Sequence, residues 1–304
     1  NLKQHTAKMK TGFKILLIFL PKLIYGQIDL IPPVDTSLIF LPNIVSTSNL
    51  EHSSPSINID NNLICWSMWD RPKPENPKQK IKILTYKSDS APEIIEFSEK
   101  YSNGGPILID QKTILFYSKR PIDKNKPDEL INDLWIIEKI DNNWIEQYCL
   151  NFSKHTRFAF TPTISDSRTI YFVGYADSVE NNMGIYYSKL GDSEYKEPKL
   201  LTSLINSKYF DWTPFIADDE SYLIFSSNRP GSKDKYGDLF ISFRDKNDNW
   251  TEPISLGDKI NTDKQERFPS VSKDLGILFF TRATDSNYDD IFWIDSKIID
   301  EIRD

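Results

Sequence analysis

The sequence predicts an all-β fold, a β-propeller of five four-stranded blades closed by a strand from the N-terminal part of the chain. A unit of about 53 residues recurs five times along the 304 residues. The composition agrees, because 18 Phe, 14 Tyr and 7 Trp stand beside only 11 Gly. Short strands packed through large flat side chains, with turns built on Asn and Asp, are typical of such a chain. At 39% hydrophobic residues it is also too apolar for a disordered polymer.

Each unit begins with a proline in an alternating apolar stretch that ends at an aspartate. The prolines are Pro55, Pro106, Pro162, Pro214 and Pro269, at intervals of 51, 56, 52 and 55 residues. The aspartates are Asp60, Asp110, Asp166, Asp218 and Asp274. Aspartate and asparagine supply turn hydrogen bonds and tolerate left-handed backbone angles. We therefore expect a first strand and then a tight turn in every unit.

Three further strands follow each turn. The second is a buried apolar run that starts at Leu63, Ile114, Ile170, Leu223 and Ile277. The third starts at Lys80, Asn132, Met183, Gly237 and Asp289. The fourth is clearest from Glu197 and from Glu252. Four strands in a unit make a propeller blade.

The last unit lacks a fourth strand, and the N-terminal part of the chain offers one. The run SLIFLPNIVST from Ser37 has the composition of a fourth strand and precedes Pro55. We expect it to pair near Ile291, which would close the ring and remove two exposed sheet edges. Six blades are less favoured, because residues 27–37 are too few for four strands.

The front of the chain predicts export. Residues 9–26 combine Lys10 and Lys14 with an apolar run and a small residue, Gly26, as a secretory signal does. Pro21 and Lys22 interrupt the run, which falls short of the roughly 20 residues of a membrane span. We expect residues 1–8 to be an upstream extension, residues 9–26 a cleaved signal, and residues 27–304 one propeller domain. No cysteine follows the apolar run, so no lipid anchor is expected, and the protein would be periplasmic or extracellular, without a membrane span.

The net charge and the small number of Cys and His residues exclude several classes of function. Removing residues 1–26 deletes five Lys and no acid, which leaves 32 basic and 44 acidic residues and a net charge of -12. Such an acidic chain is an unsuitable partner for nucleic acid. Two Cys and three His are too few for a zinc ribbon or a His-rich centre, so we expect no metal and no cofactor. Cys65 and Cys149 fall in strands of different units, and we expect both thiols to be free and buried, with a disulfide between them as the alternative.

One stretch carries a resemblance to a known family. The run DWTPFIADDESYLIFSSNRPGSKDKYGDLFISF, from Asp211 to Phe243, resembles the WD40-like (PD40) repeat of TolB-like exported propellers. The resemblance extends over residues 38–299, although Gly184 and Lys82 replace the repeat's aspartate in the third and first units. It implies an exported propeller that binds a protein or peptide. TolB has six blades and an additional domain, which this chain does not match.

Four arginines occupy equivalent positions just after the second strand of a blade. Two interpretations are open. The arginines could form a ring that binds an anion or a carboxylate, or each could pair with the aspartate that begins the third strand, such as Asp133, Asp238 or Asp290. The four are Arg71, Arg120, Arg229 and Arg282.

The residues ahead of each repeating proline should surround the axial channel on the same face as the arginines. They differ most between units, which favours a ligand site there, with a solvated rim as the alternative. Trp212 is the candidate for an exposed stacking surface. The expected ligand-binding set adds Arg157, Asp211, Trp212, Glu266 and Arg267 to the four arginines.

The sequence favours a monomeric, non-catalytic module that binds a protein, a peptide or a glycan of the cell envelope. The motifs GxSxG, GxGxxG, GxxxxGK, HExxH and CxxC are all missing, so no catalytic residue is assigned. The alternative is a small carbohydrate-active hydrolase or lyase at the axial mouth, because glycosidase chemistry needs only two carboxylates. The first candidates for these two carboxylates are Glu51, Asp211 and Glu266. A scaffold without any pocket is a third possibility.

Overall fold

The computed structural model describes residues 30–58, 60, 62–70, 75, 78–86, 93–95, 101–141, 143–284 and 288–303. The upstream extension, the expected signal and Arg71 lie outside the described residues. Within that described part, no helix has the length and apolar character needed to cross a membrane.

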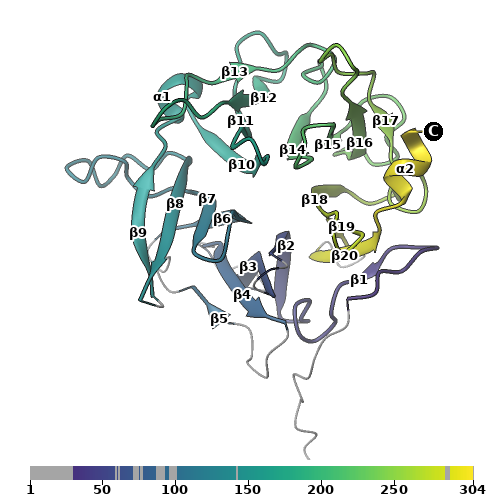
Figure 1. Cartoon of the computed structure of the whole chain (residues 1–304), viewed down its shortest axis with the longest axis horizontal. Helices are drawn as coiled ribbons and strands as arrows, with labels where there is room; N and C mark the ends of the chain where they lie inside the picture. Colours follow the sequence, from purple (N-terminus) through teal and green to yellow (C-terminus); the bar gives the residue numbers. More distant parts are fainter. Residues whose placement is uncertain are drawn as a thin grey trace, which may run out of the picture.

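Five antiparallel four-stranded sheets stand around a central axis (Figure 1), which confirms the predicted five-bladed propeller. Blades 1 to 4 each use four consecutive strands, and blade 5 takes its outermost strand from the N-terminal part of the chain. Blade 1 is β2 (Leu50–Asn58), β3 (Leu63–Asp70), β4 (Lys80–Thr85) and β5 (Glu93–Ile94). Blade 2 is β6 (Asn103–Leu108), β7 (Thr113–Ser118), β8 (Asp133–Ile140) and β9 (Asn143–Cys149). Blade 3 is β10 (Ala159–Ile164), β11 (Ile170–Tyr175), β12 (Met183–Ser188) and β13 (Lys199–Leu200). Blade 4 is β14 (Asp211–Ile216), β15 (Tyr222–Ser227), β16 (Asp238–Phe243) and β17 (Ile254–Ser255), and blade 5 is β18 (Glu266–Ser272), β19 (Ile277–Ala283), β20 (Asp289–Asp295) and β1 (Leu38–Ile39).

The ring closes where the sequence predicted. Strand β1 pairs antiparallel with β20, so that Leu38 lies opposite Trp293 and Ile39 opposite Phe292. The backbone N–H of Phe40 then donates to the carbonyl of Ile291 at 2.8 Å. The closing strand is only two residues long, and the rest of the predicted run is loop.

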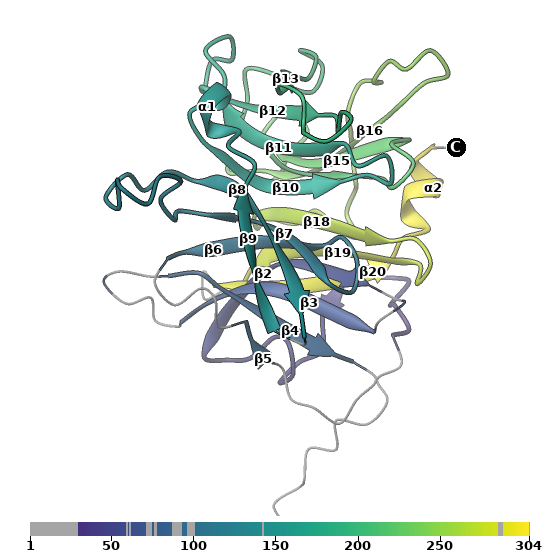
Figure 2. The same cartoon turned by 60° about the vertical axis from the view of Figure 1, so that its left-hand side comes forward.

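The hydrophobic core is divided into five clusters, one between each pair of neighbouring blades. Figure 2 shows the blades stacked around the axis. The second strands supply the most deeply buried side chains, as their apolar runs predicted; Phe116, Phe172 and Phe225 are completely buried. Trp66 and Trp135 are buried in these interfaces as well. Packing between blades, rather than within one sheet, therefore holds the ring together.

Every innermost strand carries a bulge just before its repeating proline. The register between the first and second strands shifts at this point in all five blades. Such a bulge bends a strand and increases its twist. The residue before each proline has a positive φ: Ser54 (52°), Gly105 (57°), Thr161 (49°), Thr213 (46°) and Phe268 (51°). Four of the five are not glycine, so the surrounding ring must stabilise a backbone conformation that is unfavourable for them.

Three features were not predicted. Strand β9 has seven residues, whereas the outermost strands of the other blades have two. A short helix, α1 (Ser153–Thr156), precedes β10, and a second, α2 (Ile298–Arg303), covers part of the interface between blades 4 and 5. Both cysteines are free, as expected, and Cys65 is buried, but the expected burial of Cys149 is wrong, because this residue is partly exposed in an outermost strand.

Candidate functional site

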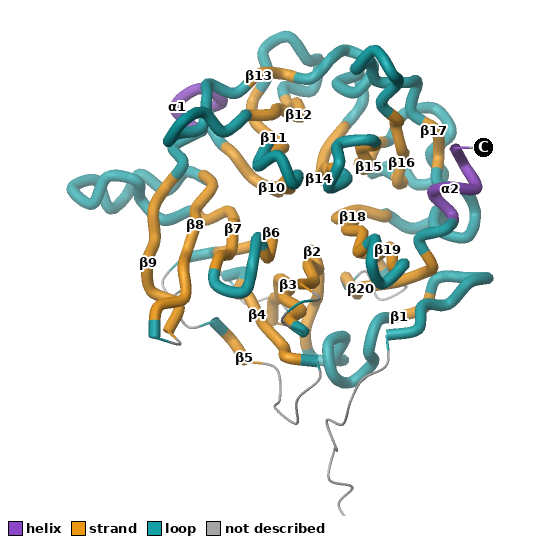
Figure 3. The backbone as a smooth tube through the Cα atoms, viewed as in Figure 1, coloured by secondary structure: helices purple, strands orange, loops and turns teal. Residues whose placement is uncertain are grey.

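The axis has two different ends. The innermost strands begin at one end, beside Arg120, Arg229 and Arg282, which we call the arginine end. They finish at the other end, where they turn into the second strands, which we call the hairpin end; these turns gather around the centre of the ring (Figure 3). A six-residue strand separates the two ends by about 17 Å.

At the arginine end, blade 4 contains an internal ion pair. Arg229 Nη2 donates to Asp211 Oδ1 at 2.8 Å, and both side chains are almost completely buried. Ser227 Oγ donates to the same carboxylate oxygen at 2.6 Å. The remaining guanidinium N–H groups reach the carbonyls of Leu204 and Ile205 and the hydroxyl of Ser227. All of Asp211 and Arg229 is thus used to fix the first residue of β14.

Blade 5 repeats this ion pair, and blade 2 has in its place a hydrogen bond from an arginine to a neutral asparagine. In blade 5, Arg282 Nε donates to Glu266 Oε1 at 2.7 Å, and its Nη2 donates to Ser37 Oγ at 3.0 Å, which ties the closing segment to the ring. Burial raises the pKa of Glu266 to about 7, against the opposing hydrogen bonds from Thr262 and Arg282. In blade 2, Arg120 Nη2 donates to Asn103 Oδ1 at 2.8 Å.

The three described arginines therefore bond to the first residue of the innermost strand. The interpretation in which they pair with third-strand aspartates is not supported for Asp133 and Asp238. Asp133 instead accepts backbone N–H groups of Leu134, Phe152 and Ser153. Asp238 accepts those of Lys233 and Asp234. The carboxylates of Asp133 and Asp238 therefore hold neighbouring loops in place through backbone hydrogen bonds.

The other residues of the predicted set are spread over the arginine end. Arg157 is exposed; its guanidinium lies 3.9 Å from the ring centre of Tyr175 and 3.6 Å from Asp177. Arg267 pairs with Asp289. Trp212 is half-buried against the core between blades 3 and 4 and lies 6.1 Å from Phe268, so it is not the exposed platform that we expected. Of the suspected catalytic acids, Asp211 and Glu266 are held in ion pairs, and Glu51 is buried.

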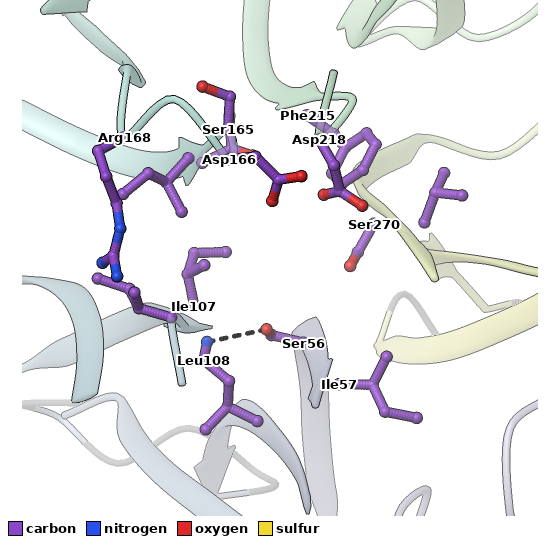
Figure 4. A pocket seen from close by; sticks show the side chains of 14 residues that line it. Ser56, Ile57, Ile107, Leu108, Ser165, Asp166, Arg168, Phe215, Asp218 and Ser270 are labelled. Carbon is purple, nitrogen blue, oxygen red and sulfur yellow. Dashed lines mark hydrogen bonds between the residues drawn. The ribbon is translucent and has the colours of Figure 1, made fainter. Parts of the chain in front are cut away.

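The hairpin end opens into a cavity of about 330 Å³ on the axis (Figure 4). Aliphatic side chains such as Ile57, Ile107 and Val271 form part of its wall, with Phe215. Its polar groups come from four blades: Ser56, Ser165, Asp166, Arg168, Asp218 and Ser270. The accessible lining is more polar than apolar, and its polar groups converge on one space, which suits a small polar molecule.

Asp166 and Asp218 bring two carboxylates together in this cavity. Each sits in the hairpin turn of its blade, and the N–H of Asp166 donates to the carbonyl of Asp218 at 2.9 Å. Figure 4 shows the two side chains directed toward each other, with Arg168 on another part of the wall. Burial raises the pKa of Asp218, and the neighbouring carboxylates of Asp166, Asp219 and Asp274 raise it further. Asp218 therefore holds a proton more strongly than an ordinary aspartate.

A buried network fixes the turn that carries Asp166. Glu220 accepts from Ser165 Oγ at 2.9 Å, from Ser167 Oγ at 2.7 Å and from Tyr171 OH at 3.0 Å. Arg244 donates to its other side at 2.8 Å. The carboxylate of Glu220 thus accepts hydrogen bonds from four residues, which belong to blades 3 and 4. These bonds fix the position of the blade 3 hairpin relative to the blade 4 hairpin.

The sequence pointed to Glu51, Asp211 and Glu266 as candidate paired carboxylates, whereas the structure brings Asp166 and Asp218 together in one cavity. The sequence presented Asp166 and Asp218 as turn residues, although their repeat positions already placed them at one end of the innermost strands. Among the described residues there is no cluster of three or more His, Cys, Asp or Glu that could hold a metal ion.

No protein-family model and no curated protein matches the chain. Solved structures do. A thermostable family-43 glycoside hydrolase has a TM-score of 0.54 at 10% identity, over 81% of this chain and 89% of its own. An α-L-arabinofuranosidase from Lactobacillus brevis has a TM-score of 0.52 at 13% identity, over 80% and 90%. A protein of unknown function from Dyadobacter fermentans scores 0.51 at 12% identity, over 87% and 83%. At these identities the likeness shows the propeller fold alone.

Proposed function

We propose that this propeller is a carbohydrate-active hydrolase whose site is the axial cavity at the hairpin end. The observation that carries the proposal is the pair Asp166 and Asp218, two facing carboxylates in a cavity of about 330 Å³. Glycoside hydrolysis uses such a pair, one group as an acid and the other as a base or nucleophile. The fold that this chain shares with two glycosidases supports the same class of reaction.

The environments of the two aspartates suggest their roles. Asp218, whose pKa is raised by burial and by its acidic neighbours, would donate the proton to the leaving-group oxygen. The carboxylate of Asp166 would act on the opposite side of the bond, on water or on the sugar itself. Arg168 and the cavity hydroxyls of Ser56 and Ser270 would hold the sugar's own hydroxyl groups.

The test is turnover of a panel of chromogenic glycosides by the wild type and three variants. We expect Asp218→Asn and Asp166→Asn each to lower kcat/KM at least 100-fold, and Asp192→Asn, in an outer loop of blade 3, to keep it. The rate should fall as pH rises through the raised pKa of Asp218, because the acid then loses its proton. Absence of turnover on every glycoside, or full activity of Asp218→Asn, would refute the proposal.

A second candidate is non-catalytic binding of an envelope protein, peptide or glycan at the arginine end. Arg157 favours it, since its side chain is 64% exposed while Arg120, Arg229 and Arg282 are held inside the ring. Recovery of a partner from an envelope extract by the wild type, and its loss with Arg157→Ala, would support this function. Export, the WD40-like relationship and a monomeric state remain predictions from the sequence.

A further inference from the structure

A second cavity continues the candidate site toward the rim of the propeller. Its volume is about 510 Å³, and it shares Asp166, Phe215, Asp218 and Val271 with the axial cavity. From there it follows the boundary between blades 4 and 5 and ends at helix α2.

The walls of this second cavity suit a polar, uncharged ligand. Ser221, Lys273 and Ser296 offer hydrogen-bond donors. At the far end Arg303 is held over aromatic rings, 4.8 Å from the centre of Phe243 and 5.9 Å from that of Tyr222. The acids of the lining are Asp166, Asp218, Asp219, Asp274 and Asp300, against the two cations Lys273 and Arg303.

We propose that the ligand is a neutral oligosaccharide, with one sugar in the axial cavity and the next in the second cavity. This inference rests on the proposed function. The two cavities share the carboxylate pair, so a bond held between Asp166 and Asp218 would have a sugar on either side. Because acids outnumber cations there, an oligomer of uronic acids would be repelled.

The experiment compares kcat/KM for neutral aryl glycosides of one, two and three sugars with that for a uronic-acid oligomer. We expect at least a tenfold gain from one sugar to two, and none for the acidic oligomer. Ser221→Trp would fill the second cavity and remove the gain, whereas Ser193→Trp, in an outer loop of blade 3, would keep it.

The outcomes separate the two proposals. If no glycoside of any length is cleaved, the proposed function fails and this inference fails with it. If glycosides are cleaved at a rate that does not depend on length, or if Ser221→Trp keeps the gain, the hydrolase stands and the second sugar site does not.

A different observation concerns the centre of the ring. A small cavity of about 30 Å³ lies there, lined by the five residues that precede the repeating prolines and by three of these prolines, Pro162, Pro214 and Pro269. Ser54 and Thr161 line it and are only 8% and 5% exposed. Their hydroxyl oxygens have no hydrogen-bond partner among the residues that the structure describes. Buried polar groups without a partner are rare and costly in folded proteins.

We infer that this central cavity binds ordered water through the hydroxyls of Ser54 and Thr161. About 10–15 Å³ suffices for one water molecule, and a water needs two or more polar partners. The hydroxyl of Thr213 accepts a hydrogen bond from the N–H of Phe268 at 3.2 Å. Its own hydrogen can be donated to a water molecule in the cavity. The walls are uncharged, so water fits better than an ion.

Water relaxation dispersion, which counts long-lived internal water, tests this site together with a high-resolution crystal structure. We expect water density beside Ser54 and Thr161, and Thr161→Val to reduce the number of long-lived waters. Thr202→Val, on the surface of blade 3, should leave that number unchanged. A dry cavity, an ion in place of water, or an unchanged count in Thr161→Val would overturn the inference.

Discussion

The balance between burial and neighbouring hydrogen-bond donors decides the pKa of two buried acids of this propeller, Glu220 and Glu266. Burial would raise the pKa of Glu220, but hydrogen bonds from Ser167, Ser165, Thr169 and Arg244 lower it to about 2. Burial of Glu266 prevails over fewer donors and raises its pKa to about 7. The carboxylate of Glu220 is therefore charged at neutral pH and links blades 3 and 4. The carboxylate of Glu266 can titrate near neutral pH.

Glu220→Gln should destabilise the protein by about 1–3 kcal/mol at pH 7, because hydrogen bonds to a charged group are lost. The folded-state pKa of about 2 lies below the ordinary value of 4.5, so the contribution of Glu220 is complete above pH 4.5. It is lost as pH falls from 4.5 toward 2. Urea unfolding at pH 7 and at pH 3 measures this, and the difference between variant and wild type should shrink at pH 3. A difference independent of pH would contradict the charged state of Glu220.

Among the elements, strand β1 closes the whole ring although it is only two residues long. Two residues of β1 pair with β20, and Phe40 beside them is completely buried. Its ring lies 4.8 Å from that of Phe279 and 5.2 Å from that of Trp293. Side-chain packing therefore complements the few hydrogen bonds of the closure.

Phe40→Ala should lower the free energy of unfolding by about 3–5 kcal/mol, the usual cost of removing a buried aromatic ring. Val34→Ala, an exposed position of the same segment, should change it by less than about 0.5 kcal/mol. Thermal and urea unfolding provide the measurement. A small effect of Phe40→Ala would mean that the ring does not depend on this closure.

For the molecule as a whole, the two ends of the axis are chemically distinct. The acids of the arginine end are neutralised by internal pairs, whereas those of the hairpin end face a cavity. A ligand site at the hairpin end thus leaves the arginine end free for another role.

Ile57→Trp should fill the axial cavity at the hairpin end and abolish saccharide binding. Arg157→Ala should leave saccharide binding unchanged, since Arg157 lies at the other end of the axis. Isothermal titration of both variants with a saccharide that binds the wild type distinguishes the ends. The reverse pattern would move the site to the arginine end.

The fold could be predicted from the sequence because each unit repeats the same signals: a proline, an aspartate turn and a buried apolar run. The length of β9 and the helix α2 do not repeat, so nothing in the pattern announced them. The site was harder, because it depends on distances across the axis. Arg229 and Asp211 are 18 residues apart and meet in one blade, whereas Asp166 and Asp218 are brought together only when two blades pack.

The pairing of Ile39 with Phe292 also sets an order of events during synthesis. A ribosome releases Ile39 long before Phe292 exists, so this strand must wait for almost the whole chain. Contacts between residues so distant in sequence are slow to form, because a long loop must close first. Four blades can assemble while the chain grows, and the fifth is completed only once Phe292 has been synthesised and is free to pair.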